Sequence, residues 1–501
     1  MLRWWEVHFL PMTESSTPRA WTHGNYGVCR LEGRENPAFV LNEGGSPPER
    51  WLQQIWRHQR LQRTKLVALD GRPVRVLHPG FWNRESGPDF KDAVIQLGSG
   101  LTLVGDVEVD LHPAGWFGHG HASNPAYDRV VLQVVWGPGS RPVDRAVLAV
   151  SDVLDCPLDE MAPWLEDEAI QRLPATTPGR CCGPLSRVDR DRTEALLDEA
   201  ARVRLNRKVA EFAARGRSVG WEAVLWEGVF GALGYRENSW PMRRLAEIAA
   251  RQLPKGNVQV CEAMLFGIAG LLPPGMRQGE GSAYVQSLWD IWWEEQSDWK
   301  ELILPRKAWR IVGVRPLNHP QRRLALAARW IADPTWINRV RAFLNLEGRR
   351  RTSTAWFVRE LCEGFNSTSE AFWRSHWTLR AGDRSGLLPW IGPARTTDLA
   401  INVFLPWMIA EARMQGDEDR ALRLERRWME WPKGQDNGDL KFARRRLWAG
   451  AKADVRWTAA RQQGLLQVRR DFCLAAGSLC TGCRFPSVVG HPETEGKCGG
   501  L

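Results

Sequence analysis

The sequence has no stretch of eighteen or more consecutive apolar residues, and a helix needs about 20 of them to cross a bilayer. We therefore expect no membrane-spanning helix. The N-terminal segment MLRWWEVHFLP is too short and too mixed in character to resemble a secretory signal. Together these absences predict a cytoplasmic protein without a membrane partner.

Cysteine is too sparse for a disulfide scaffold, with 10 residues in a chain of 501. No fixed-period repeat is present, so a solenoid is not supported. Glycine-rich pieces such as Gly267-Ile268-Ala269-Gly270 match neither a P-loop nor a dinucleotide fingerprint. The chain also lacks a serine nucleophile elbow, which leaves no indication of these common enzyme classes.

The bulk composition is that of an ordinary globular protein, with 43% hydrophobic and 25% charged residues. Its length suggests two to three domains at about 150 residues each. Lys and Arg number 68 against 58 Asp and Glu, which gives a net charge of +10. A basic surplus dominated by Arg is compatible with nucleic-acid binding and equally with plain solubility. The 28 Trp residues lie mostly in amphipathic helical stretches, which favours packing over base stacking.

The apolar pattern predicts an α+β fold. Residues 1–47 are rich in Gly, Pro, Ser and Asn and are typical of a loosely ordered lead-in. A helix is expected to start at Pro47-Pro48-Glu49. From Gly71 the apolar residues alternate in short runs separated by turns, which predicts several hairpin-connected strands and a further strand over 146–151. We therefore predict a mixed α and β domain over 48–156 that carries a metal site. The alternating apolar residues are Val74, Val76, Ala93, Ile95, Leu97, Leu103, Val107, Val109, Val130, Leu132 and Val134.

The remainder of the chain changes character twice. Five prolines interrupt residues 157–190, which predicts a linker. Helical periodicity then continues over 191–470 and predicts a large all-helical domain. Residues 471–501 form a tail that contains a cysteine cluster.

A row of ionisable residues occupies one predicted strand. Because residues two apart in a strand point to the same face, Asp106, Glu108, Asp110 and His112 are expected to form one polar row. Such a row could be the solvated face of a half-exposed sheet. Four ionisable groups would, however, repel each other or resist burial unless a divalent cation compensates them. We favour the cation, with Mg²⁺ or Mn²⁺ suited to the carboxylates and Zn²⁺ to the imidazoles.

Further candidate ligands flank this row. Asp89 begins the preceding strand and would lie beside the row in a hairpin. His119 and His121, followed by Asp128, lie in the next turn and could close over the site. We therefore predict Asp89, Glu108, His119, His121 and Asp128 as metal ligands.

Pro88-Asp89 and Glu108-Val109-Asp110 resemble the motif of the restriction-endonuclease-like phosphodiesterases, in which an Asp at a strand's start precedes Asp/Glu-x-Lys on the next strand. The resemblance implies a nuclease-like sheet in which Asp89 and Glu108 hold the metal and a metal-bound water attacks the phosphodiester. Asp110 stands where that family has lysine. Lys91, Arg75 or His112 could supply the missing charge or proton transfer, and Gln133 could be an additional polar group beside the ligands.

A resemblance over nearly the whole chain rests on four segments. Gly87-Pro88-Asp89-Phe90, the run from Gly105 to Asp110, and Gly118-His119-Gly120-His121 are similar to an uncharacterised bacterial family, domain of unknown function 2851. The later Asp471-Phe472-Cys473 with Cys480-x-x-Cys483 is similar too. This resemblance implies a soluble bacterial protein and brings no established activity.

Three cysteines near the C-terminus are spaced like metal ligands. Cys473, Cys480 and Cys483 would supply three of the four thiolates that a Zn²⁺ site or a [4Fe–4S] cluster needs. The fourth ligand could be Cys498, His491 or the distant Cys29. Some nucleases of the restriction-like fold bind an iron–sulfur cluster with one cysteine before the core and three after it. The order of Cys29 and the three C-terminal cysteines resembles that arrangement. The alternative is a set of reduced, unligated thiols.

Several basic groups in the helical part could contact phosphates. Each alone is usually a solvated face, and only their number favours a nucleic-acid partner, DNA or RNA. The candidates are Arg202, Arg204, Lys208, Arg315 and Arg322.

The preferred function is thus a metal-dependent phosphodiesterase acting on nucleic acid. One alternative is a non-catalytic nucleic-acid-binding or scaffold protein with a degenerate nuclease-like core. Another is a Zn²⁺-dependent hydrolase of a different substrate, in which His119, His121 and Asp128 hold the metal.

Overall fold

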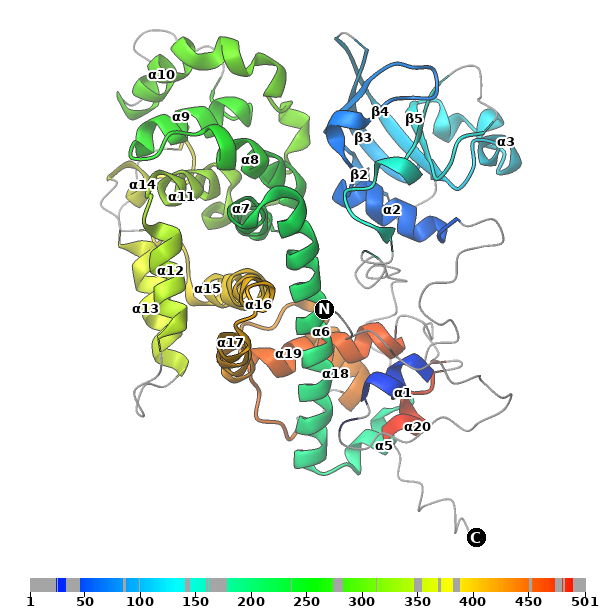
Figure 1. Ribbon diagram of the computed structural model, residues 1–501, viewed down its shortest axis with the longest axis vertical. Helices are drawn as coiled ribbons and strands as arrows, with labels where there is room; N and C mark the ends of the chain where they lie inside the picture. The colour runs from blue at the N-terminus through cyan, green and yellow to red at the C-terminus, as the bar shows by residue number, and fades with distance from the viewer. Residues whose placement is uncertain are drawn as a thin grey trace.

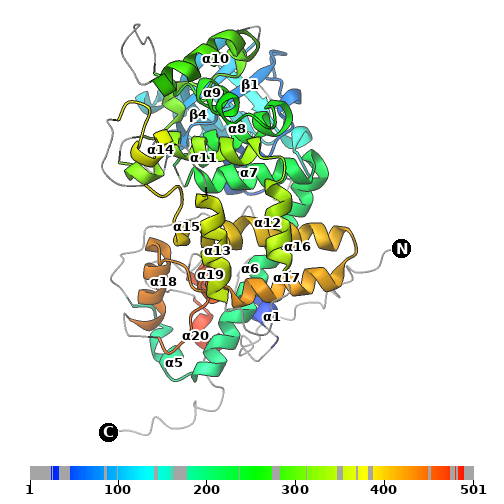
Figure 2. The same cartoon turned by 90° about the vertical axis from the view of Figure 1, so that its left-hand side faces the viewer.

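The computed structural model describes residues 24, 26–32, 46–83, 87–98, 100–139, 145–158, 161, 178–235, 237–273, 283–311, 313–346, 354–367, 371–381, 388–449, 453–473, 480 and 483–489. The fold is α+β, as the sequence predicts. A mixed sheet with one covering helix (the sheet unit) lies beside a large helical region, and the two views of the molecule agree on this arrangement (Figures 1 and 2). No helix in the described part of the chain is long and apolar enough to cross a membrane.

One sheet contains all the strands of the described residues, in the order β1-β3-β4-β5-β6 with β2 paired to β3. The β1, β3 and β4 strands are antiparallel, and β5 and β6 continue the sheet in parallel. The expected hairpins are therefore correct for β3–β4 and wrong for the last two connections. The strands are β1 (Val74–His78), β2 (Phe81–Trp82), β3 (Phe90–Leu97), β4 (Leu101–Asp110), β5 (Val130–Val135) and β6 (Ala146–Ala149).

Helix α2 (Glu49–His58) covers one face of the sheet. It begins directly after Pro48, which adopts an extended conformation at the cap position. Its residues Trp51, Leu52, Ile55 and Trp56 are buried in one hydrophobic cluster with the alternate apolar residues of the strands. This packing fixes the first turn of α2, which includes Glu49, near the start of β3 and the end of β4.

The connection from β4 to β5 crosses the other face of the sheet, because parallel strands cannot be joined by a tight hairpin. It consists of three short helical turns: α3 (Gly115–Gly118), η2 (His121–Ser123) and η3 (Pro125–Tyr127). The Asn124 side chain accepts a hydrogen bond from the Ala126 N–H and starts the last turn. The two predicted histidine ligands lie in this connection.

Helix α6 (Arg190–Val219) runs through the middle of the molecule and links the upper part of the helical region to a lower helical cluster (Figure 1). Many tryptophans are buried in the helical core, and Trp336 stacks against both Trp226 and Trp330. This agrees with the expected packing role. The remaining long helices of the region are α7 (Trp221–Leu233), α8 (Ser239–Gln252), α9 (Val258–Ile268), α10 (Ala283–Trp299), α11 (Pro320–Ala332), α12 (Trp336–Asn345), α13 (Thr354–Asn366), α16 (Leu405–Met414) and α17 (Glu418–Glu430), with the shorter α14 (Ala371–Ser375) and α15 (Pro393–Leu399).

The lower cluster joins segments from both ends of the chain (Figure 1). Within the predicted lead-in, residues Tyr26–Glu32 form helix α1. The Tyr26 hydroxyl donates to the fully buried Asp471 at 2.9 Å, which fastens α1 to the C-terminal part. The cluster also contains α5 (Cys182–Ser186), α18 (Gly438–Trp448), α19 (Ala459–Val468), the π-helical turn η9 (Arg469–Cys473) and α20 (Phe485–Val489).

Candidate metal centre

The acidic row on β4 is buried rather than solvated. Asp106, Glu108 and Asp110 are 3%, 7% and 1% exposed, which argues against a water-covered sheet face. The row is shorter than expected, because β4 ends at Asp110 and His112 lies in an exposed bend beyond it. Asp106 accepts a hydrogen bond from the Asp92 N–H at 3.0 Å, beside the irregular register of β3 and β4. The Asp106 carboxylate is therefore hydrogen-bonded to the backbone of β3.

Asp89 and Glu108 are neighbours through the Asp89 main chain, and neither joins the close group of ligand atoms that Asp110 forms with two histidines. The Asp89 N–H donates to Glu108 Oε2 at 3.0 Å, and the Val109 N–H donates to Asp89 Oδ2 at 3.3 Å. Gln53 Nε2, from α2, donates to Asp89 Oδ1 at 3.1 Å and to Glu49 Oε1 at 3.3 Å. Glu49 is an additional acid that sequence reasoning missed, since only the packing of α2 on the sheet brings it here.

These carboxylates resist ionisation in the metal-free protein. Burial, and then the charge of Asp89, raise the pKa of Glu108 to about 9. Burial, and then Glu49, raise the pKa of Asp89 to about 7, and burial followed by Asp110 raises the pKa of Glu49. Such perturbed carboxyl groups are concentrated at functional sites. A divalent cation would remove the repulsion between them.

The candidate sources of positive charge lie elsewhere. Arg75 Nη1 is 3.1 Å from Glu301 Oε2 in the helical region. Lys91 lines the cleft described below. The lysine-like role in the motif is thus not filled by either residue in this conformation.

Two histidines complete the site from the β4–β5 connection. The candidate ligand atoms of Asp110, His119 and His121 all lie within 4.8 Å of one another. His119 Nδ1 is 3.1 Å from Asp110 Oδ1, and His121 Nε2 is 3.2 Å from Glu108 Oε1. Neither Asp110 Oδ1 nor His121 Nε2 has a hydrogen-bond partner among the described residues, although both atoms are buried. With Nε2 unprotonated, both atoms offer a lone pair, and a metal ion that both would bind satisfies them together.

The groups around these ligands hold them in place. Gln133 Nε2 donates to Asp110 Oδ2 at 2.8 Å, which leaves Oδ1 directed toward the histidines. Tyr127 stacks on the His121 ring with the centroids 4.0 Å apart, and Trp116 contacts the same ring edge-on. Burial lowers the pKa of His121, so its imidazole is neutral and able to ligate. His119 is exposed at the mouth of the site, whereas Asp128 is exposed at the end of η3 and lies outside this close group.

Gly115 offers a direct test of Asp110. A Cβ at Gly115 would lie 2.8 Å from Asp110 Oδ1, whereas a Cβ at Gly118 in the same turn would meet nothing within 4 Å. We expect Gly115→Ala to displace the carboxylate and weaken Mn²⁺ or Zn²⁺ affinity roughly 10- to 100-fold. Calorimetric titration of both variants checks this. Equal affinity for Gly115→Ala and Gly118→Ala would show that Asp110 is not a ligand.

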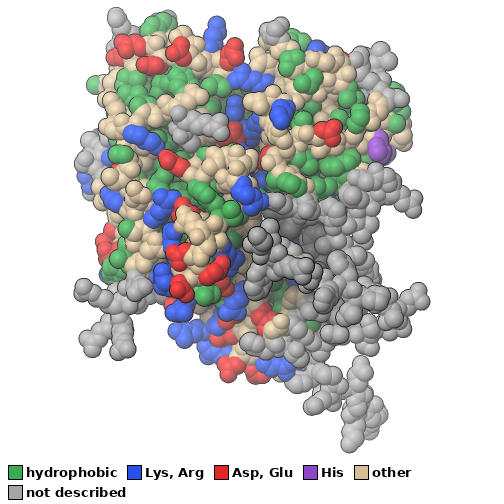
Figure 3. Space-filling view, viewed as in Figure 1, with side chains coloured by type: hydrophobic (Ala, Val, Ile, Leu, Met, Phe, Trp, Pro, Cys, Tyr) green, Lys and Arg blue, Asp and Glu red, His purple; other side chains and the backbone are tan. Residues whose placement is uncertain are grey.

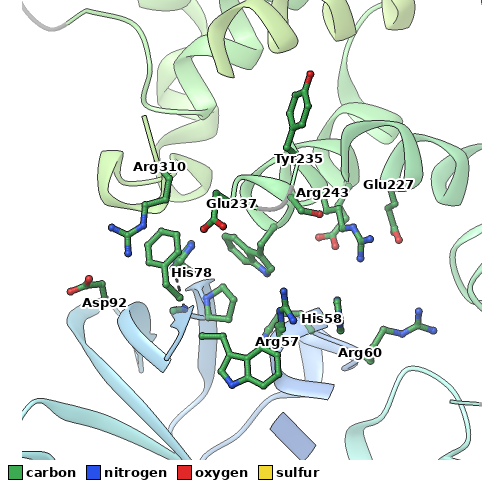
Figure 4. A pocket seen from close by; sticks show the side chains of 18 of the residues that line it. Arg57, His58, Arg60, His78, Asp92, Glu227, Tyr235, Glu237, Arg243 and Arg310 are labelled. Carbon is green, nitrogen blue, oxygen red and sulfur yellow. Dashed lines mark hydrogen bonds between the residues drawn. The ribbon is translucent and has the colours of Figure 1, made fainter. Parts of the chain in front are cut away.

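A separate cleft of about 1180 Å³ lies between the sheet unit and the helical region. Figure 4 shows its two walls, with Arg57, His58, Arg60, His78 and Asp92 on the sheet side and Glu227, Tyr235, Glu237, Arg243 and Arg310 opposite. Basic side chains also gather along this seam on the molecular surface (Figure 3).

The cleft adjoins the candidate metal centre through Asn83. This residue lines the cleft, its N–H donates to the Asp89 carbonyl at 2.7 Å, and its Nδ2 donates to the Pro88 carbonyl at 2.9 Å. Arg310 lies over the Phe81 ring at 3.9 Å, and the buried Nε of Arg243 has no hydrogen-bond partner among the described residues. The cleft thus carries guanidinium groups next to the loop that holds Asp89.

The predicted nucleic-acid-binding residues are dispersed. Arg202, Arg204 and Lys208 lie on α6. Arg202 is 3.7 Å from Glu425, and Arg204 Nε donates to Gln463 Oε1 at 2.7 Å. Arg315 is exposed before a short 3-10 turn. Arg322 is fully buried, and its guanidinium donates to the carbonyls of Trp373, His376 and Pro389. Its hydrogen bonds give Arg322 a role in packing, and they keep it away from solvent.

The comparison with family models gives one match. The family described as "Protein of unknown function (DUF2851)" matches residues 49–437, which include the sheet unit and most of the helical region. No curated protein and no solved structure matches the chain.

Proposed function

The chain belongs to the DUF2851 family, whose description assigns no activity, and from the geometry of its site we propose that it is a metal-dependent phosphodiesterase acting on nucleic acid. The observation that carries this proposal is the close group of Asp110, His119 and His121, in which the buried Asp110 Oδ1 and His121 Nε2 have no hydrogen-bond partner among the described residues, beside the carboxyl groups of Glu108 and Asp89.

The arrangement of the two acids supports the phosphodiesterase reading. Asp89 immediately precedes β3, and Glu108 lies on the neighbouring strand β4 with the two residues hydrogen-bonded. This is the order of acids in the restriction-endonuclease-like motif. Asp110 replaces its lysine and stands with two histidines, so this site favours Mn²⁺ or Zn²⁺ more than a site of carboxylates alone.

The residues have separable roles in this proposal. Asp89, Glu108, Asp110 and His121 would hold the metal, which when bound lowers the pKa of a water molecule and polarises a phosphoryl oxygen. Gln133 and Tyr127 orient the ligands by the contacts described above. His119 is exposed beside Asp110 and could accept or deliver a proton at the mouth of the site.

The cleft between the sheet unit and the helical region suits an extended anionic substrate. Arg60, Arg63 and Arg215 pair with carboxylates of the same cleft, so phosphate contacts would come from Arg243 and Arg310. Asn83 connects the cleft to the loop that carries Asp89. Trp82 and Phe81 line the same cleft, where Arg57 lies over the first ring and Arg310 over the second.

The activity is tested with the purified full-length chain and labelled DNA and RNA, single- and double-stranded. We expect cleavage with Mn²⁺, loss of cleavage after chelation by EDTA, and recovery when Mn²⁺ is returned. Intact nucleic acid under all these conditions would overturn the proposal. Salt-sensitive binding without cleavage would instead support the scaffold alternative.

A second candidate is a Zn²⁺-dependent hydrolase of another substrate. The close grouping of His119 and His121 with Asp110 favours it, since two imidazoles and a carboxylate are a common catalytic zinc set. Hydrolysis of small esters with Zn²⁺, lost in His121→Ala, together with intact nucleic acid would support this candidate.

A further inference from the structure

A group of cysteines gathers in the lower helical cluster, far from the acidic site. Cys181 and Cys182 come from the start of α5, while Cys473, Cys480 and Cys483 come from the C-terminal segment. Cys181 and Cys473 are buried in one hydrophobic cluster, and Cys483 packs against it. Segments almost 300 residues apart thus bring their thiols together, which the spacing of the C-terminal trio alone does not indicate.

Arg446 on α18 lies among these thiols. Its main-chain carbonyl accepts from Cys182 Sγ at 3.1 Å and from Cys181 Sγ at 3.9 Å. Its buried Nη2 donates to Cys480 Sγ at 2.7 Å. One residue therefore touches thiols from both segments.

The local backbone also suits a ligand site. Cys480 has a positive φ of 54°, and the Cys483 N–H donates to the Cys480 carbonyl at 3.2 Å. This hydrogen bond holds the two cysteines close together in the chain's C-terminal segment. Gly179 lets the α5 loop approach, because a Cβ there would lie 2.9 Å from the Arg446 carbonyl and 3.2 Å from Cys181 Sγ.

Cys181 is the cysteine of its pair that is buried in the same cluster as Cys473, and Cys483 packs against that cluster. Cys182 is only partly buried. Cys181 is therefore the better partner of the trio.

We propose that Cys181, Cys473, Cys480 and Cys483 form a four-thiolate site for a thiophilic metal, either Zn²⁺ or an iron–sulfur cluster. The site is independent of the acidic centre and of its proposed activity. It would fasten α5 to the C-terminal segment, next to the contact between Tyr26 and Asp471 that holds α1. Arg446 would offset part of the negative charge of four thiolates by donating to Cys480.

The thiols do not yet converge on one point. Among the described residues, only Asp110, His119 and His121 bring three ligand atoms within 4.8 Å of one another. Cys181 donates to the Arg446 carbonyl instead. Cys483 likewise donates to the Phe472 carbonyl at 3.8 Å, so binding requires both side chains to leave these carbonyls and the four thiols to draw together.

The test is metal analysis of the full-length chain purified anaerobically, with Cys181→Ser and Cys182→Ser as matched neighbours. We expect wild type and Cys182→Ser to hold about one zinc per chain, or about four irons with visible absorbance. Cys181→Ser and Cys483→Ser should lose that metal. A metal-free wild type, or loss from Cys182→Ser with retention in Cys181→Ser, would overturn the assignment.

A second measurement keeps the proposal testable if the serine variants do not fold. The chelated wild-type chain is titrated with Co²⁺, and intense thiolate-to-metal absorption is expected at saturation. The same titration of Glu108→Gln should give the same absorption, since that carboxylate belongs to the acidic site. Absorption without thiolate character would overturn the four-thiolate site.

Discussion

Glu108→Gln is expected to reduce Mn²⁺-dependent phosphodiester cleavage by roughly a thousandfold, the scale of losing one strong electrostatic contact in a transition state. Glu108 Oε1 lies 3.2 Å from His121 Nε2, and Oε2 accepts from the Asp89 N–H, so this carboxylate joins both sides of the proposed site. An amide keeps the shape of the side chain and removes the charge that would hold the metal. Single-turnover cleavage at saturating Mn²⁺ measures the effect.

The fold should tolerate this substitution. The pKa of Glu108 is raised to about 9 by burial and by Asp89, so at neutral pH the metal-free protein holds this side chain as a neutral acid. Glutamine replaces one neutral group by another. Glu301→Gln is the matched control, because Glu301 is 81% exposed and pairs with Arg75 in the helical region. Unchanged cleavage by Glu108→Gln would exclude Glu108 from the reaction.

Metal affinity is expected to rise about a hundredfold between pH 6 and pH 8. The metal binds the ionised carboxylate, and below a pKa of about 9 the proton on Glu108 must leave first, at about tenfold per pH unit. Asp89, with a pKa raised to about 7, strengthens the dependence at the acid end of this range. Titration calorimetry with Mn²⁺ at several pH values, in buffers of different ionisation enthalpy, also counts the protons released.

The same pKa values determine whether the stability of the metal-free protein rises or falls with pH. A carboxyl group whose pKa is raised on folding favours the folded state at low pH, and that contribution is lost as the pH rises through the folded value. The metal-free protein should therefore lose stability toward pH 9, and Glu108→Gln should reduce that loss. A metal affinity that is flat with pH would contradict the proposed ligand set.

The strand pattern predicted much of the sheet unit because burial on one face imposes a period of two. Val107 and Val109 pack against α2, and the intervening Glu108 faces away from that core, as the alternation requires. The parallel pairing of β4 with β5 was not predicted. The connection over residues 111–129 is long enough for a crossover, but its glycines and prolines show no helical periodicity that would indicate one.

Site residues that belong to one short motif were predicted from the sequence. Site residues that only tertiary packing brings together were missed. Asp89 and Glu108 meet because Phe90 pairs with Val107, which places their neighbours side by side beyond the register shift of β3 and β4. Glu49 reaches the same point only through the docking of α2, and Cys181 reaches the C-terminal cysteines only through α18. Such long-range contacts leave no periodic signature in a single sequence.

The central claim is that the buried acids and histidines form a divalent metal centre, and anomalous diffraction from crystals soaked in Mn²⁺ tests it most directly. The account predicts a strong anomalous peak with Asp89, Glu108, Asp110 and His121 as ligands, at about 2.0–2.3 Å from the ligand atoms. Crystals of Glu108→Gln soaked in the same way should show a weaker peak or none. A saturated crystal with no peak at these side chains, or with a peak at unrelated residues, would contradict it.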